Sequence, residues 1–168
     1  RTEFLGIFEP DCMALGRWWA RSTARRSCRG GYGVLPVPAE LPGALDTLDA
    51  MLDGRRSAFE TFLRIPLPAK RRNIELDCKD YDNLGYLSGH SVGEAESAMF
   101  DALVQSHAAL DIPLIVLSAE QLDAPQLGEL FYFLELTAAL CAAADGLNPF
   151  DRKRTSPTRA QAAACLQG

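Results

Sequence analysis

The segment from Ile112 to Ser118 constrains the fold of this chain more than any other part. It is a continuous apolar run that contains no charged residue. A strand with one wet face alternates apolar and polar residues, whereas a continuous run is typical of a strand buried on both faces of a parallel sheet. Such a strand requires cover from helices on both sides. We therefore expect a layered fold of strands and helices.

Strands and helices alternate along the rest of the chain. Ser91 and Glu94 have the spacing of a capping box, which marks the start of a helix. The helix from Pro125 to Asp145 is apolar nearly all round, so we expect it to be mostly buried. The alternation predicts an α/β three-layer sandwich, a mainly parallel sheet flanked by helices, formed by a single domain over 1–168. The expected strands are 3–8, 34–38, 61–65, a weaker 73–77, and 112–118, and the expected helices are 11–24, 43–53, 91–110 and 125–145.

The composition argues against several classes of protein. A net charge of −5 argues against nucleic-acid binding. The uncharged apolar stretch 136–144 is shorter than the roughly 20 residues that a bilayer span needs. Five cysteines without a C-x-x-C pair, and only two histidines, argue against a disulfide framework and a metal site. We expect a cytoplasmic protein that uses no metal, no cofactor, no nucleic acid and no membrane.

Short motifs follow one another in a specific order along the chain. They are Phe8-Glu9-Pro10, Trp18-Trp19, Asp53-Gly54-Arg55-Arg56, Phe59-Glu60-Thr61, the segment 83–89, His107 with Pro113, and Leu127 to Glu135 followed by Asn148-Pro149-Phe150-Asp151. In this order they resemble the glucose-6-phosphate isomerase family over nearly the whole chain. The resemblance implies the C-terminal sugar-isomerase (SIS) domain of that family, a parallel sheet sandwiched by helices. It also implies that the first SIS domain, with its phosphate-binding loop, has no counterpart here.

The resemblance further locates the groups that carry out aldose–ketose isomerisation in the family. The position of the base glutamate falls on Arg25, that of the ring-opening histidine on Leu45, and that of the catalytic lysine on Arg159. Arginine stays protonated at accessible pH and cannot exchange a proton as a base would. Leucine has no titratable group. The resemblance therefore implies a truncated and degenerate relative with no confident catalytic residue.

Arginines give the chain one further candidate site. Arg21 and Arg25 lie four residues apart on one face of a helix, and with Arg159 they are candidate ligands of a phosphate or sugar phosphate. The alternative is a solvated helix face whose arginines pair with acidic residues of the following helix, Asp46, Asp49 and Asp53. His107 keeps a family-like position, and we interpret it as a structural residue.

Two functions remain open at this stage. The first is a catalytically inactive isomerase-like domain that acts by binding or by self-association, as a homodimer or with a partner chain. The second is an active or split glucose-6-phosphate isomerase that interconverts glucose 6-phosphate and fructose 6-phosphate in glycolysis or gluconeogenesis. A split enzyme would need a partner chain to supply the phosphate loop and a substitute base. The altered residues favour the first function.

Overall fold

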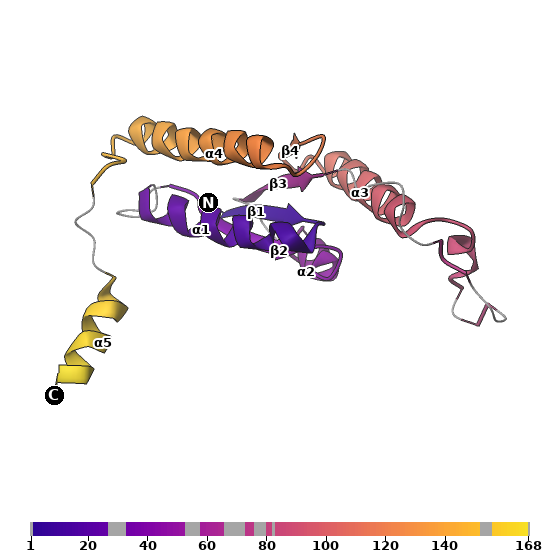
Figure 1. Ribbon diagram of the computed structural model, residues 1–168, viewed down its shortest axis with the longest axis horizontal. Coiled ribbons are helices and arrows are strands. Elements are labelled where there is room, and N and C mark those ends of the chain that lie inside the picture. Colours follow the sequence, from indigo (N-terminus) through magenta and orange to yellow (C-terminus); the bar gives the residue numbers. More distant parts are fainter. Residues whose placement is uncertain are drawn as a thin grey trace.

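The fold is built around a four-stranded parallel sheet (Figure 1). A computed structural model of the protein describes residues 2–26, 33–52, 58–65, 73–75, 80–81, 83–151 and 156–167. The strands are β1 (Thr2–Ile7), β2 (Leu35–Glu40), β3 (Ala58–Arg64) and β4 (Leu114–Ser118), in the order β2-β1-β3-β4. This arrangement confirms the expected α/β fold class.

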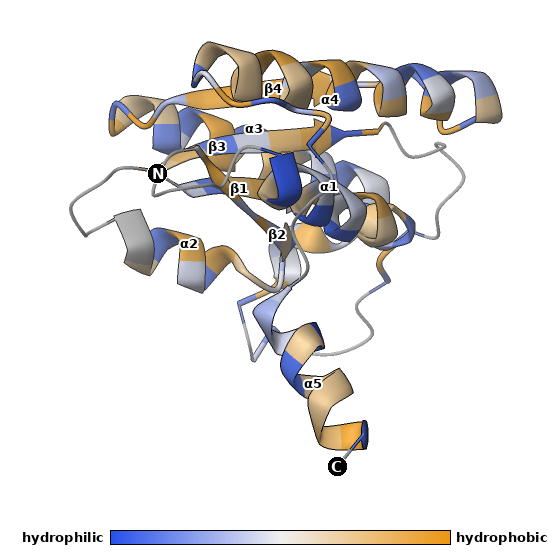
Figure 2. Cartoon of the chain, turned by 90° about the vertical axis from the view of Figure 1, so that its left-hand side faces the viewer, coloured by the Kyte–Doolittle hydropathy of each residue, from blue (hydrophilic) through white to orange (hydrophobic). Residues whose placement is uncertain are grey.

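Helices cover both faces of the sheet, as Figure 2 shows for α1 and α2 on either side of it. On one face lie α1, which follows the short 3-10 turn η1 (Pro10–Cys12), and α4. On the other face lie α2 and α3. A further helix, α5, extends away from the sheet and buries none of its described residues. The bounds are α1 (Met13–Arg26), α2 (Leu45–Leu52), η2 (Gly85–Leu87), α3 (Val92–Ala109), α4 (Ala124–Ala144) and α5 (Pro157–Gln167).

Side chains of β1, β3 and β4 alternate between two apolar clusters, one on each face of the sheet. The first cluster lies under α1 and α4 and contains Leu5, Ile7, Cys12, Leu15, Trp19, Leu63, Leu134 and Ala138. The second lies under α2 and α3 and contains Phe4, Leu41, Leu48, Phe62, Phe100 and Leu103. The helices of the two clusters thus lie on opposite faces of the sheet.

Two glycines allow the layers to approach closely. A Cβ atom at Gly6 of β1 would lie 2.5 Å from the ring of Phe62 and 2.8 Å from Leu41. A Cβ atom at Gly16 of α1 would lie 2.5 Å from Cδ1 of Ile7. Both distances are shorter than a carbon–carbon contact, so these positions accept no larger side chain without movement of the core.

A buried carboxylate ties three elements together. Glu3 of β1 accepts hydrogen bonds from Nε1 of Trp19 at 3.2 Å and from Oγ1 of Thr61 at 2.8 Å. The tryptophan belongs to α1 and the threonine to β3. Trp18 is only partly buried and packs edge-on against Phe131 of α4, at 4.5 Å between ring centroids. These contacts fix α1 and α4 on the same face.

The predicted capping box at the start of α3 is present. Oγ of Ser91 accepts from the backbone N–H of Glu94 at 3.1 Å, and Oε2 of Glu94 accepts from the backbone N–H of Ser91 at 2.7 Å. The weaker strand expected at 73–77 does not form over its described part, because Asn73 makes only an isolated antiparallel bridge with Ser91. Residues 76–77 lie outside the described part of the chain.

Two expectations about burial are wrong. β4 is not buried on both faces, because it is an edge strand and Ile115 and Val116 are 50% and 37% exposed. α4 is not mostly buried either, since only Leu134, Ala138 and Ala142 of its residues are buried. In β4 the two exposed residues are adjacent and point to opposite faces, so both faces of this strand are only partly covered by the described residues. In α4 the described residues cover one side of the helix.

Candidate functional site

A pocket lies at the carboxyl ends of β1 and β3. Its volume is about 200 Å³, and it is lined by Phe8, Glu9, Arg64, Ile65, Gly93, Glu96, Ser97 and Phe100. Phe8 and Glu9 follow β1, and Arg64 and Ile65 lie at the end of β3. The other four residues belong to the first turns of α3. Sheet and helix thus form its two walls.

The topology explains why a pocket forms at this point. From β1 the chain passes through α1 to β2, on one side of β1 in the sheet. From β3 it leads through α3 to β4, on the other side and across the opposite face. The connections diverge between β1 and β3, and such a switch point at the carboxyl ends of parallel strands is where open α/β sheets bind ligands.

The pocket combines charged and aromatic groups. Arg64 lies with its guanidinium carbon 4.6 Å from the centroid of the Phe100 ring, and its Nη1 is 3.2 Å from Oδ1 of Asp101. Glu9 and Glu96 add carboxylates to the lining. An arginine held by an aromatic ring and a carboxylate has little freedom, which favours a fixed orientation toward a small polar ligand. The sequence analysis missed this site, although charged residues at or just beyond the ends of two buried strands, Arg64 and Glu9, were a usable signal.

The structure separates two of the residues at the family's catalytic positions. Arg25 lies in the last turn of α1 and is exposed, on the face of the sheet that carries α4. Leu45 is the first residue of α2 and packs against the cluster under α2 and α3. Arg25 precedes the amino end of β2 and Leu45 follows its carboxyl end, so the two residues lie on opposite faces and at opposite ends of the sheet.

Arg159 lies on α5, apart from both of these positions. The helix begins at Pro157, and all its described residues are exposed. The preceding Asn148-Pro149-Phe150-Asp151 segment forms a turn in which Oδ1 of Asn148 accepts from the backbone N–H of Phe150 at 3.0 Å. Residues 152–155, between this turn and α5, lie outside the described part.

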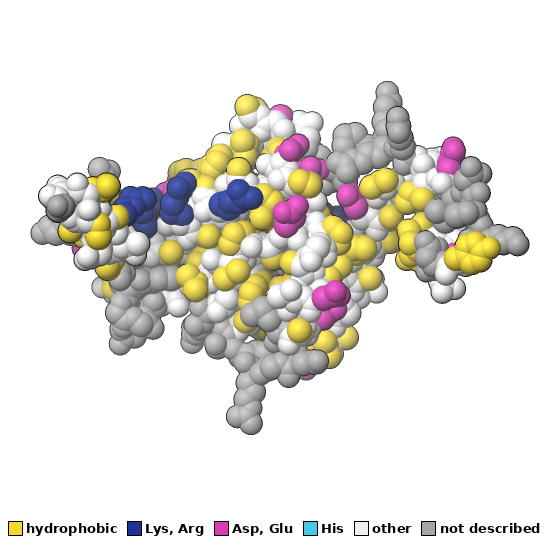
Figure 3. All heavy atoms as spheres, turned by 90° about the horizontal axis from the view of Figure 1, so that it is seen from below, with side chains coloured by type: hydrophobic (Ala, Val, Ile, Leu, Met, Phe, Trp, Pro, Cys, Tyr) yellow, Lys and Arg dark blue, Asp and Glu magenta, His cyan; other side chains and the backbone are white. Residues whose placement is uncertain are grey.

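The arginines of α1 form a row on one side of the molecule. Arg17, Arg21 and Arg25 are exposed on this helix, and Figure 3 shows dark-blue basic side chains in a row on the side seen from below. Arg26 points toward α4 and pairs with Glu135, which also accepts from Oγ of Ser22 at 3.0 Å. The row supplies positive charge on an otherwise acidic chain.

The alternative pairing of these arginines with the helix at 43–53 is wrong for its described residues. Asp46 and Asp49 belong to α2, on the opposite face of the sheet from α1. Asp49 contacts a histidine of α3 instead of an arginine, with Oδ1 3.3 Å from Nε2 of His107. Asp53 lies outside the described residues.

His107 occupies a buried position between α3 and β3. Its Nδ1 is 2.7 Å from Oε2 of Glu60, and each of the two side chains is 1% exposed. His107 contacts two carboxylates, those of Glu60 and Asp49. Neither of these acidic residues lines the pocket at the carboxyl ends of β1 and β3. This burial agrees with the interpretation of His107 as structural.

Metal binding and membrane insertion can be considered for the described residues alone. No group of three or more His, Cys, Asp or Glu side chains among them could hold a metal ion.

One described helix, α4, is long and apolar enough to cross a membrane by length and composition. One such helix is weak evidence for a membrane span, and Leu134 and Ala138 of α4 belong to the apolar cluster that α1 shares.

The fold defines an α/β protein with a parallel sheet. Its pocket lies at the switch point between β1 and β3, where such sheets bind ligands. Sequence comparisons then place the chain more narrowly. It is 29% identical over 166 residues to glucose-6-phosphate isomerase of Listeria monocytogenes, a match that covers 98% of this chain and 37% of that protein. It is 32% identical over 152 residues to glucose-6-phosphate isomerase of Staphylococcus epidermidis, covering 90% of this chain and 34% of the relative. The enzyme of Streptococcus thermophilus is 30% identical over 152 residues.

The chain is therefore a homologue of part of glucose-6-phosphate isomerase, as the motifs predict. It spans about a third of the length of the curated relatives that it matches. No protein-family model matches it. A crystal structure of a hypothetical protein from Thermus thermophilus superposes with a TM-score of 0.85 at 16% identity, over 99% of this chain and 41% of that one. That likeness confirms the fold.

Proposed function

We propose that this isomerase-related domain is catalytically inactive on its own and acts by associating with another polypeptide chain. The chemistry at the family's three catalytic positions carries the proposal. A base for proton transfer between carbon atoms must be able to lose and regain a proton near neutral pH. Arg25, Leu45 and Arg159 do not meet this requirement, since arginine remains protonated and leucine has no acid–base group.

The positions of these residues add to the chemical argument. Arg25 and Leu45 lie on opposite faces of the sheet, and Arg159 lies on a helix that packs on neither cluster. Catalysis requires reacting groups to converge on one substrate with close to bonding geometry. A single molecule with this fold offers no such convergence for these three side chains.

An isomerase assay tests directly whether the domain is catalytically inactive on its own. The purified chain is incubated with fructose 6-phosphate, and formation of glucose 6-phosphate is measured beside the Staphylococcus epidermidis relative as a positive control. We expect no turnover above that of a buffer blank. Turnover that Arg159→Ala abolishes would show that this chain carries catalytic groups and would overturn the proposal.

A split isomerase is the second candidate, and the coverage of the relatives favours it. The chain matches only 34–37% of their length, so a partner could supply the rest of an isomerase. Activity would then appear only when both polypeptides are present. The same assay with the partner added separates the two functions, because the inactive domain gives no turnover in either case.

A sugar-phosphate site on α1 is a weaker third function, supported by the exposure of Arg21 and Arg25 on one helix. A bound phosphate would accept charge-assisted hydrogen bonds from both guanidinium groups. Calorimetry with glucose 6-phosphate at millimolar concentration tests it, with Arg21→Ala and Arg25→Ala as variants and Arg159→Ala, on α5, as the comparison. Absence of heat would remove this function.

We also propose a cytoplasmic location, which the free thiols of Cys12, Cys141 and Cys165 support.

A further inference from the structure

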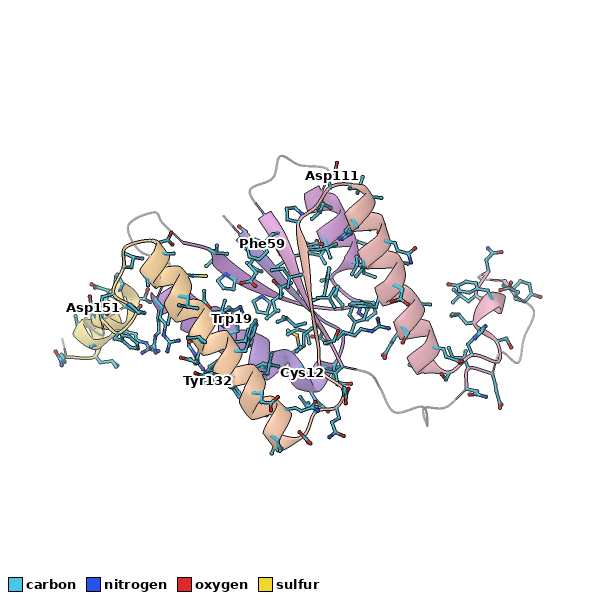
Figure 4. All side chains as sticks on the ribbon, turned by 90° about the horizontal axis from the view of Figure 1, so that it is seen from above. Cys12, Trp19, Phe59, Asp111, Tyr132 and Asp151 are labelled. Carbon is cyan, nitrogen blue, oxygen red and sulfur yellow. The ribbon has the colours of Figure 1, made fainter. Side chains whose placement is uncertain are left out.

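The pocket at the carboxyl ends of β1 and β3 is lined by side chains of both charge signs. Glu9 follows β1, Arg64 ends β3, and Glu96 belongs to α3. In Figure 4, the turn with Cys12, just after Glu9, lies at the same end of the molecule as the first turns of α3, whereas Asp111 beyond α3 lies at the other end. Two carboxylates and one guanidinium group thus reach one pocket from three separate elements.

Apolar groups complete the lining. The ring centroids of Phe8 and Phe100 are 5.5 Å apart in an edge-on contact, and Phe100 is buried. Ile65 adds an aliphatic side chain. In small-molecule sites, apolar groups of this kind contact the hydrocarbon part of the ligand, and a few polar groups fix its orientation. The pocket therefore suits a molecule that is charged in one part and apolar in another.

The guanidinium group of Arg64 is suited to bind a carboxylate. It is held by the ring of Phe100, 4.6 Å from its central carbon, and by Asp101, 3.2 Å from its Nη1. A guanidinium group carries five N–H donors in a fixed plane, so it can bind a second carboxylate beside Asp101. Because its orientation is fixed before binding, little side-chain entropy is lost when the ligand arrives.

The size and the charges of the pocket narrow the class of ligand. Its volume of about 200 Å³ is below the roughly 300–1,000 Å³ of pockets that hold drug-sized molecules, so the ligand is small. A lone anion would lie near the carboxylates of Glu9 and Glu96, and a lone cation would lie near Arg64. Like charges at such distances repel, and the repulsion is strong in a partly enclosed site. A zwitterion avoids both repulsions, because each of its charges can lie beside the opposite charge of the protein.

We infer that this pocket binds a small amino acid with an aliphatic side chain of about the size of leucine. Its carboxylate pairs with Arg64, and its ammonium group pairs with Glu96 and Glu9. Its side chain lies against Phe8 and Ile65. The inference uses only the pocket lining, so it stands independently of the proposed function.

Leucine and two truncated analogues test the ligand class on the full chain. Isopentylamine keeps the branched chain and the ammonium group but lacks the carboxylate, whereas 4-methylpentanoate keeps the chain and the carboxylate but lacks the ammonium group. Titrations followed by amide chemical shifts measure the dissociation constants and locate the site. We expect shifts centred on Gly93 and Ser97 of the lining, and about tenfold tighter binding of leucine than of either analogue, since each analogue lacks one charge-assisted contact.

Charge-neutral variants assign each contact. Glu96→Gln should weaken leucine about tenfold and should not weaken 4-methylpentanoate, which has no ammonium group. Arg64→Gln should weaken leucine by a similar factor and should not weaken isopentylamine. Glu129→Gln, at an exposed position of α4 outside the lining, is the matched control and should leave leucine binding unchanged. Circular dichroism verifies that the three variants are folded.

Several results would overturn the inference. Leucine that does not bind, or that binds no more tightly than one of its analogues, shows that the site does not recognise a zwitterion. Amide shifts that lie away from Gly93 and Ser97 place the ligand elsewhere. Equal loss of leucine binding in Glu129→Gln and Glu96→Gln removes the assigned contact.

Discussion

The imidazole of His107 is held between two carboxylates that come from different elements. Nδ1 lies 2.7 Å from Oε2 of the buried Glu60 on β3, and Nε2 lies 3.3 Å from Oδ1 of Asp49 on α2. The side chain of Asp49 is 67% exposed, whereas Glu60 is almost fully enclosed. The histidine thus connects α3 to the centre of the sheet and to the neighbouring helix.

Removal of both members of the buried pair should cost less than the sum of the two single removals. His107→Leu leaves the carboxylate of Glu60 enclosed without its partner, which typically costs about 3–5 kcal/mol of unfolding free energy. The double variant with Glu60→Leu replaces the pair by apolar side chains and should lose less than the sum of the two single losses. Urea unfolding measures all three. Asp49→Asn, at the exposed partner, serves as the control and should change the unfolding free energy by about 1 kcal/mol or less. Single variants as stable as this control would contradict the prediction.

Two glycine-to-alanine changes should act in opposite directions. Gly6→Ala drives a methyl group into Phe62 and Leu41 and should destabilise the fold by about 1–3 kcal/mol. Gly128 lies on α4, and a Cβ atom there would meet no other atom within 4 Å, so Gly128→Ala should stabilise the helix by up to about 1 kcal/mol. Thermal unfolding distinguishes a falling from a rising midpoint. Equal shifts for both variants would show that close packing at Gly6 is not the reason for its glycine.

The order of strands and helices could be predicted from the sequence because local signals determine it. Ser91 and Glu94 mark the start of α3 through hydrogen bonds that span only three residues. The α5 helix was missed, although Pro157 at its start and the alanines at 160 and 162–164 favour a helix there.

The exposure of β4 and α4 could not be predicted in the same way. An apolar pattern in Ile115 or Leu140 shows that a residue requires cover, but it does not show whether the cover belongs to the same chain. The sequence also could not predict where Arg25 and Leu45 lie relative to each other. Their positions along the chain do not show that their helices lie on opposite faces of the sheet. The pocket beside Arg64 depends on strand order, which a single sequence does not give.

The capping box should make the stability of the protein depend on pH. A hydrogen bond from the Ser91 backbone, together with one involving its side chain, lowers the pKa of Glu94 below its ordinary value. A lowered pKa stabilises the folded state above the unfolded pKa, and this contribution is lost as pH falls through the folded pKa. The difference in unfolding free energy between the natural chain and Glu94→Gln should therefore be present at neutral pH and shrink in acid. Denaturant unfolding at several pH values measures it.

Variants of the capping serine provide the control for this effect. Ser91→Ala removes the hydroxyl group that accepts from the Glu94 backbone and should cost about 1 kcal/mol. Ser91→Thr keeps a hydroxyl group and should cost less. A difference for Glu94→Gln that does not change with pH would show that the carboxylate charge plays no part in the cap.

The described cysteines should differ in their reactivity toward iodoacetamide. Burial, with the carboxylates of Glu9 and Asp11 nearby, raises the pKa of Cys12, and only the thiolate reacts. Burial, with Asp145 and Glu3 nearby, also raises the pKa of Cys141. Cys165 is exposed on α5 and should be alkylated first. Mass spectrometry of the three peptides over a pH series measures the rates, and equal rates for Cys12 and Cys165 at neutral pH would refute this order.

Restoring the family's catalytic residues should not restore isomerase activity to the isolated chain. The triple variant Arg25→Glu, Leu45→His and Arg159→Lys carries a base, a titratable histidine and a lysine at the positions that the resemblance indicates. However, positions 25 and 45 lie on opposite faces and at opposite ends of the sheet, so we expect the new glutamate and histidine not to reach one substrate molecule. Proton transfer depends on a base within hydrogen-bonding distance of the substrate, and a correct residue at the wrong distance contributes little.

We therefore expect no turnover of fructose 6-phosphate by the monomeric triple variant, at any enzyme concentration where sedimentation shows a single copy. The single variant Leu45→His is the control for folding, because Leu45 packs against the cluster under α2 and its loss alone could lower stability. If the folded monomeric triple variant turned over substrate, the separation of these residues in the fold would not be what prevents catalysis. The loss of activity would then lie in residue identity alone, and the part of the relatives that this chain does not match would be dispensable for the chemistry.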